Sequence, residues 1–298
     1  MAEAAAARPA PRGRRPPLRA GTLLKHATLI LVAVAIGFPF YWMVTTAFKD
    51  FFEATRFPPT LLPVEPTLAN FPAAWAEAPW GRYFLNTFLV ATLVTLGELV
   101  TAVLAAYALA RMSFAAKAVV FSVLLATYMI PSEATIIPNY VLMSRSRTAC
   151  FGLPCLGLYD TYQAQIVPFL ASVFSIFLLR QFFLSIPKEL HDAATIDGAG
   201  HLRFLRSVVL PISVPALITV ALISFLGAYN SFLWPLIVTS KDELRPIQVG
   251  MSVFRGEFGA QYHLQMAAAT FVIAPIVGLY LVAQRYLVQG VARTGIRG

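Results

Sequence analysis

Residues 207–240 read SVVLPISVPALITVALISFLGAYNSFLWPLIVTS, a run without a charged side chain. An α-helix needs about 20 mainly apolar residues to cross the hydrocarbon core of a bilayer. The run is longer than one crossing requires, and Pro211 and Pro215 near its start indicate that its first residues lie outside the hydrocarbon. It therefore predicts a membrane-spanning helix over residues 211–238.

The composition of the whole chain agrees with this prediction. Of its 298 residues, 58% are hydrophobic and 12% are charged, and the mean hydropathy is +0.70. Soluble domains carry about 25% charged residues, so an ordinary soluble enzyme, a disordered protein and a disulfide scaffold are excluded. We expect an all-α, polytopic membrane protein.

The charge-poor runs predict six membrane-spanning helices. These cover residues 27–48, 83–110, 118–134, 161–180, 211–238 and 264–285. Glu98 is the one charged residue inside the second run. The third run is short and is interrupted at Pro131, and residues 135–143 are a candidate re-entrant segment.

The basic residues are distributed unevenly between the two predicted sides of the membrane. The chain has 23 Lys and Arg and 14 Asp and Glu, for a net charge of +9. Fifteen of the 23 basic residues fall in the segments on the same side as the N-terminus. Cytoplasmic loops carry the excess of Lys and Arg, so we expect both termini in the cytoplasm. The net charge then reflects topology, and nucleic-acid binding is disfavoured.

Residues 1–22 are rich in Ala, Pro and Arg and predict a disordered basic arm, ahead of a transmembrane domain over residues 23–298. The run at 27–48 is longer than the apolar core of a signal peptide, and no small-residue cleavage pattern follows it. It is therefore interpreted as a retained signal-anchor.

The two cysteines, Cys150 and Cys155, lie in the predicted outer loop between the third and fourth spans. In an oxidising compartment they could form a small disulfide loop, and two unpaired thiols are the alternative. A metal site is not expected, because two thiols without a nearby His supply at most half of a zinc site.

Motifs for bond-making chemistry are absent from the sequence. It has no Gly-x-x-x-x-Gly-Lys-Ser/Thr phosphate loop, no Gly-x-Ser-x-Gly elbow and no His-Glu-x-x-His zinc helix. An ion-coupled secondary transporter would favour paired intramembrane acids and an internal repeat. Glu98 is a single acid, so that class is the less favoured alternative.

The loop before the fifth predicted span has a distinctive pattern. Residues 185–211 read SIPKELHDAATIDGAGHLRFLRSVVLP. Pro187 suits a first helical turn, and Gly198 offers a left-handed stop. A second helical stretch is predicted over residues 202–209. The pattern predicts a helix, a glycine corner and a second short helix on the cytoplasmic side, and an ordinary amphipathic connector on the membrane surface is the alternative.

Asp192-Ala-Ala-Thr-Ile-Asp-Gly-Ala199, followed by Phe204 and Pro211, resembles the "EAA" loop of ABC importer permeases, with Asp192 in place of the usual Glu. Four other stretches resemble the carbohydrate-uptake branch of that family. They are residues 105–111, 130–138, 179–183 and 229–235. The resemblance covers about residues 29–298, and residues 145–155 look like an insertion.

The resemblance implies a type I ABC importer permease fold in a bacterial or archaeal cytoplasmic membrane. It implies that residues 185–207 are a coupling loop that docks on a separate ATPase subunit, which would hold ATP and Mg²⁺, so this chain is expected to be no enzyme and to bind no cofactor. The residues that carry this role are Glu189, Asp192, Ala193, Ala194, Asp197, Gly198, Ala199, Phe204 and Pro211. Further implied partners are a second, similar permease subunit and an extracytoplasmic solute-binding protein. The implied cargo is a sugar or oligosaccharide, with glycerol 3-phosphate or another polar solute as the alternative.

Polar and aromatic groups inside spans are expensive and are therefore candidates for a substrate path. They are Asn86, Glu98, Tyr128, Glu133, Tyr229, Asn230 and Trp234. Aromatic rings suit the faces of a sugar, and amides and carboxylates suit its hydroxyls. Structural alternatives stay open: Asn230 could bond a neighbouring helix, Trp234 could anchor at the interface, and Glu98 could pair with a helix neighbour.

Overall fold

The structure is a computed structural model that describes residues 20–144, 155–256 and 259–294. Helices dominate this part of the chain. They are α1 (Ala20–Ala47), α2 (Phe51–Thr55), α3 (Asn70–Ala76), α4 (Trp80–Arg111), α5 (Lys117–Tyr128), α6 (Ser132–Met143), α7 (Tyr162–Ile166), α8 (Val173–Ser185), α9 (Lys188–Ile196), α10 (His201–Phe204), α11 (Leu210–Ile212), α12 (Val214–Tyr229), α13 (Leu233–Val238), α14 (Ile247–Gly250) and α15 (Tyr262–Thr294). Short 3₁₀ turns occupy Val167–Phe169, Asp242–Leu244 and Met251–Phe254, and a π-helical turn occupies Leu205–Val209. Two two-residue strands, β1 (Arg255–Gly256) and β2 (Gly259–Ala260), pair antiparallel.

Three helices are long and apolar enough to cross a membrane unaided, and three bent helix pairs bring the number of candidate crossings up to six. The single helices are α1, α4 and α15. The pairs bend by 96° between α5 and α6, by 42° before α8, and by 79° before α12. The described residues thus fit the predicted all-α membrane class.

Prolines account for two of these bends. Pro131 has an extended backbone at the start of α6 and cannot donate a backbone hydrogen bond. Residues 118–134 therefore do not form one straight helix, and the candidate re-entrant segment lies on α6. Pro211 and Pro215 flank the second bend at Ser213, so α12 begins only at Val214.

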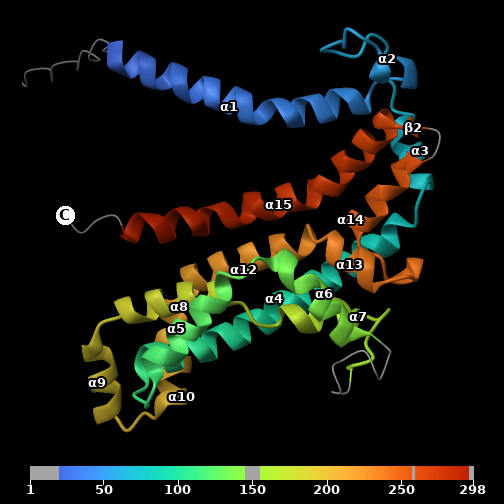
Figure 1. The fold of residues 1–298 in the computed structure, drawn as a ribbon. Coiled ribbons are helices and arrows are strands. Elements are labelled where there is room, and N and C mark those ends of the chain that lie inside the picture. The colour runs from blue at the N-terminus through green and yellow to red at the C-terminus, as the bar shows by residue number, and fades with distance from the viewer. Residues whose placement is uncertain (1–19, 145–154, 257–258, 295–298) are drawn as a thin grey trace, which may run out of the picture.

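The long helices lie roughly along one axis in Figure 1. The first residues of α1 and the last residues of α4 and α15 lie at the same end of the molecule as α9 and α10. We call this end the loop end. The elements α3, α13 and α14 lie at the opposite end. Both ends of the described chain are therefore on the side of the 185–207 loop.

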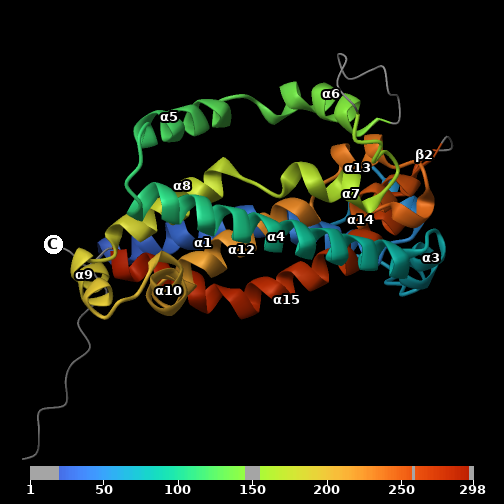
Figure 2. The same ribbon diagram turned by 90° about the horizontal axis from the view of Figure 1, so that it is seen from below.

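The helices α4, α8 and α12 form the central packing unit. Figure 2 shows α5 and α6 on its outer face, and α1 packs against α15. Small residues such as Ala102 and Ala106 are fully buried between the central helices and allow close approach. At Gly97 an added Cβ would overlap the side chain of Leu170, which would have to shift where α4 meets the segment before α8.

Two arginines tie α4 to α8 at the loop end. Arg111, the last residue of α4, donates to the carbonyl oxygens of Phe183 and Ile186 at the end of α8. In the reverse direction, Arg180 Nε donates to Leu109 O in the last turn of α4 at 3.2 Å. Guanidinium groups suit these positions, because the last carbonyls of a helix lack intrahelical partners and carry partial negative charge. We call Arg111 and Arg180 the arginine tie.

Candidate functional site: the exposed loop and a central cavity

The 185–207 loop is built on two local backbone signals. α9 begins directly after Pro187, and Glu189 lies in its first turn, where an acid interacts well with the helix dipole. α9 ends at Ile196, and Gly198, two residues further on, has a φ of +72°, a left-handed conformation. There Gly198 N donates to Thr195 O at 3.0 Å and Ala199 N donates to Ala194 O at 2.9 Å. This is the hydrogen-bond pattern of a glycine helix stop.

The residues around the glycine corner face away from the bundle. Asp192, Ala193, Asp197 and Gly198 are exposed, as is Glu189, while Ala194 and Ala199 are half-buried. Ile196 is 87% exposed. The loop thus presents small, acidic and apolar side chains on one accessible surface, and Pro211 is exposed at its far end.

Phe204 fixes the loop to the bundle. Its side chain is 2% exposed and belongs to the apolar cluster that contains Tyr107 and Phe183. The ring of His191 packs edge-on against it at 5.0 Å between centroids, and His201 Nδ1 lies 3.2 Å from Tyr107 Oη. The exposed surface of α9 is therefore mounted on α4 and α8 through a buried anchor.

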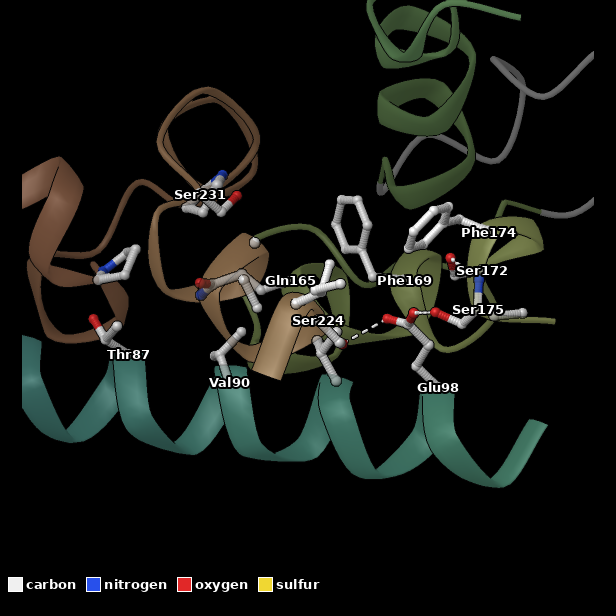
Figure 3. A pocket seen from close by; sticks show the side chains of 17 residues that line it. Thr87, Val90, Glu98, Gln165, Phe169, Ser172, Phe174, Ser175, Ser224 and Ser231 are labelled. Atoms are coloured by element: carbon white, nitrogen blue, oxygen red, sulfur yellow. Dashed lines mark hydrogen bonds between the residues drawn. The ribbon is translucent and has the colours of Figure 1, made fainter. Parts of the chain in front are cut away.

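A cavity of about 380 Å³ lies between α4, the segment around α7 and α8, and α12 to α13. Figure 3 shows the side chains that line it. The polar ones among the described residues are Thr87, Glu98, Gln165, Ser172, Ser175, Ser224 and Ser231, and the aromatic ones are Phe169 and Phe174. Thr87, Val90, Val94 and Glu98 recur at three- and four-residue spacing, which places them on one face of α4.

Glu98 connects three helices at this cavity. Its carboxylate accepts hydrogen bonds from Ser175 Oγ on α8 and from Ser224 Oγ on α12, the latter at 2.6 Å (Figure 3). The side chain is 8% exposed. Glu98 thus has helix neighbours as partners and also lines the cavity, which combines the two roles that its sequence position left open.

Three other predicted path residues hold the opposite end of the molecule together. Asn86 Nδ2 donates to Glu243 O and Arg245 O at 2.8 and 2.9 Å, which fixes the segment before α14. Tyr229 is 1% exposed, and its hydroxyl donates to Val272 O on α15 at 2.8 Å. Asn230 is exposed, and its Oδ1 accepts from Gln248 Nε2.

Tyr128 and Trp234 contact the two aromatic residues of the cavity lining. Tyr128 stacks on Phe174 at 6.3 Å, and Trp234 meets Phe169 edge-on at 6.0 Å. Trp234 Nε1 also donates to Ala164 O at 2.9 Å. Glu133 is exposed in the first turn of α6. Of the seven predicted path residues, Glu98 is the one found in the lining of this cavity.

Sequence reasoning did not select Gln165 or the four serines of the lining. Uncharged Ser and Gln side chains in an apolar run give little signal by themselves. A usable signal was Glu98, since a buried carboxylate requires hydrogen-bond donors. The sequence thus indicated that hydrogen-bond donors to Glu98 exist on other spans, but it did not indicate which residues they are. Cys150 lies outside the described residues, so the predicted disulfide with Cys155 stays a prediction, as does the N-terminal arm.

Asp160 organises the loop at the opposite end. It has a positive φ of 61°, and its Oδ1 accepts from the backbone N–H groups of Ser240 and Lys241 at 2.9 and 3.0 Å. Burial raises the pKa of this carboxyl, but the two N–H donors and the Lys241 ammonium more than offset this effect and hold the pKa below its ordinary value.

We expect Asp160→Ala to lower the thermal stability of the detergent-solubilised protein at pH 7, by about 1–3 kcal/mol for the loss of hydrogen bonds to a charged group. Because the folded-state pKa is lowered, the carboxylate stabilises the fold above the unfolded pKa, and this contribution disappears as the pH falls through the folded pKa. Thermal unfolding should therefore show a gap between the two proteins that narrows below about pH 4. A gap that is unchanged at low pH would contradict the account.

A bundle of apolar helices around a partly polar cavity is compatible with a membrane transport protein. Residues 98–293 match the family described as binding-protein-dependent transport system inner membrane component, and the chain belongs to this family. It is a membrane-embedded permease of an ABC importer and not an enzyme.

Similar proteins come from several bacteria. The sn-glycerol-3-phosphate transport system permease protein UgpE of Yersinia enterocolitica is 32% identical over 273 residues, which covers 89% of this chain and 94% of UgpE. The probable ABC transporter permease protein YurM of Bacillus subtilis is 33% identical over 275 residues, covering 91% and 87% of the two chains.

Solved structures support the fold. A chain in the crystal structure of a bacterial ABC transporter involved in import of the acidic polysaccharide alginate superposes with a TM-score of 0.77 at 21% identity, covering 92% of this chain and 99% of that one. A chain of an alginate ABC transporter in complex with an alginate pentasaccharide-bound periplasmic protein gives a TM-score of 0.65 at 15% identity, covering 89% and 94%.

Proposed function

We propose that this chain is one of two permease subunits of an ATP-driven importer and that its 185–207 loop docks on a separate ATPase subunit. The observation that carries the proposal is the exposed surface of α9 with its glycine corner, mounted on α4 and α8 through Phe204. ATP and Mg²⁺ would be held by the ATPase, and an extracytoplasmic binding protein would deliver the solute. Both termini would then lie on the cytoplasmic side of the cytoplasmic membrane, together with the loop.

The proposed cargo is a sugar or oligosaccharide. The hydroxyl, amide and carboxylate groups of the cavity, together with its two phenyl rings, fit a polyhydroxylated ring. Glycerol 3-phosphate is the second candidate, because the UgpE relative carries that solute in its name. The two candidates differ in charge, because a simple sugar is neutral and glycerol 3-phosphate is an anion. The charge of the cavity lining therefore distinguishes between them.

The docking proposal is tested by co-purification of the tagged chain from its native membrane. We expect the wild type to co-purify with an ATPase and a second permease. Asp192→Lys should lose only the ATPase, because it places a positive charge against the ATPase surface that would accept an acidic side chain. Asp192→Glu is the matched control and should retain both partners. If Asp192→Lys retains the ATPase as well as Asp192→Glu does, residue 192 takes no part in docking.

A further inference from the structure

The central cavity contains a buried acceptor without a partner. Gln165 is 2% exposed, and its Nε2 donates to Leu244 O at 3.1 Å. Gln165 is one of the residues that line the cavity, and its Oε1 is buried without a hydrogen-bond partner among the described residues. A buried acceptor left unpaired costs about 1–3 kcal/mol, so this oxygen calls for a donor.

The carboxylate of Glu98, which also lines this cavity, can accept more hydrogen bonds than it receives from the protein. A carboxylate has about four lone-pair sites, and the hydroxyls of Ser175 and Ser224 use two of them. The cavity wall along α4 from Thr87 to Glu98 extends about 16 Å at the helical rise per residue. Polar side chains such as Thr87, Ser231 and Glu98 therefore lie at separate points along a cavity long enough for a ring with several hydroxyl groups.

The charge of the lining favours neutral solutes. Glu98 is the one acidic residue in the lining, and the described lining contains no Lys or Arg. In surroundings of low dielectric constant, an anionic group near this carboxylate would be repelled without a compensating cation. Phosphate and carboxylate groups normally find Arg or Lys at their binding sites.

The remaining wall suits the apolar face of a sugar. Phe169 and Phe174 line the cavity, and their rings contact those of Trp234 and Tyr128, respectively. A binding site with apolar and aromatic walls and a few well-placed polar groups is typical for small molecules.

We propose that this cavity directly binds one uncharged sugar ring of the transported solute, and that Glu98 makes the site selective against anionic solutes. The inference rests on the proposed function and deepens it: this permease subunit contacts the cargo itself, rather than leaving all contacts to its partner. It also favours a neutral sugar over glycerol 3-phosphate.

Gly227 permits a test that leaves the polar groups in place. It lines the cavity on α12, and an added Cβ would meet no described atom within 4 Å. A side chain at this position therefore starts in open space, and we expect Gly227→Leu to reduce the volume of the cavity. Gly278 on α15 is the matched control, because a Cβ there also meets nothing within 4 Å and Gly278 is not in the lining.

The measurement is the ligand-induced rise in melting temperature of the intact purified complex, without ATP. The probes are matched pairs: glucose with glucuronate, galactose with galacturonate, and glycerol with glycerol 3-phosphate. We expect at least one neutral sugar to stabilise the wild type and Gly278→Leu, and no anion to do so. Gly227→Leu should weaken the apparent affinity by about tenfold or more. Equal stabilisation by sugar and sugar acid, no stabilisation by any neutral sugar, or an unchanged affinity in Gly227→Leu would overturn the proposal.

Glu98→Gln separates charge from shape. The carboxamide is nearly isosteric and can still bond Ser175 and Ser224, so we expect glucuronate or galacturonate to stabilise this variant where it does not stabilise the wild type. A variant that still rejects both acids would overturn the role given to Glu98. Because binding is read without ATP, these outcomes do not depend on ATP-driven transport, whereas the proposed function is tested by the loss of the ATPase from the Asp192→Lys variant.

Discussion

Gly198→Pro is expected to reduce ATP-dependent uptake to the level seen without ATP, while the protein remains in the membrane. The backbone at this position has a φ of +72°, and proline is restricted to a φ near −65°. Proline also removes the N–H group that donates to Thr195 O. An ordinary L-residue in a left-handed conformation costs about 1–2 kcal/mol, and proline cannot adopt it at all, so the corner that shapes the exposed surface of α9 is lost.

Gly198→Asn is the control for this variant. Asparagine tolerates the left-handed conformation and keeps the backbone N–H, so we expect uptake to fall by no more than a few fold. The measurement is uptake of the delivered solute into vesicles with and without internal ATP, at equal amounts of membrane-inserted protein. Full uptake by Gly198→Pro would show that the glycine corner has no part in transport.

Arg111→Met is expected to cause a large loss of stability at the loop end. It removes two charge-assisted hydrogen bonds, to Phe183 O and Ile186 O, and leaves these carbonyls near the end of α8 without their donor. Hydrogen bonds to charged groups contribute about 1.5–3 kcal/mol each. Since α9 begins two residues after Ile186, the loss should also loosen the mounting of the loop.

Thermal unfolding of the detergent-solubilised protein measures this effect, and uptake measures its consequence. Arg111→Lys keeps the positive charge but lacks the planar fork that reaches two carbonyls, so we expect an intermediate melting temperature. Arg180→Met removes the other half of the arginine tie, which has one hydrogen bond to Leu109 O, and should cost less. Equal melting temperatures of Arg111→Met and the wild type would show that Arg111 does not stabilise the contact between α4 and α8.

The loop could be predicted from the sequence because its geometry is dictated by local backbone chemistry. Pro187 and Gly198 mark where a helix starts and stops, and the structure places α9 between them. Proline likewise indicated the bends at Pro131 and near Pro211. The sequence gives no bend angle, however, and for this reason residues 118–134 were predicted as one span.

The cavity could not be predicted in the same way, because its partners are far apart in the chain. Glu98 accepts from serines 77 and 126 residues away, and no local pattern specifies such a pairing. Tyr229 and Trp234 were selected by residue type alone. The structure directs both side chains to backbone carbonyls of neighbouring elements, because residue type does not say which neighbour a helix face will meet.

The central claim is that transport by this chain is driven by a separate ATPase through the exposed loop. The most direct test is solute uptake into proteoliposomes that contain the purified complex, with either the wild-type ATPase subunit or one whose phosphate-loop lysine is replaced by alanine. We predict uptake that requires ATP and disappears with the altered ATPase, while this chain and its partners remain assembled. Undiminished uptake with the altered ATPase would contradict the claim, and would make Glu98 as an ion-coupling residue the next hypothesis to test.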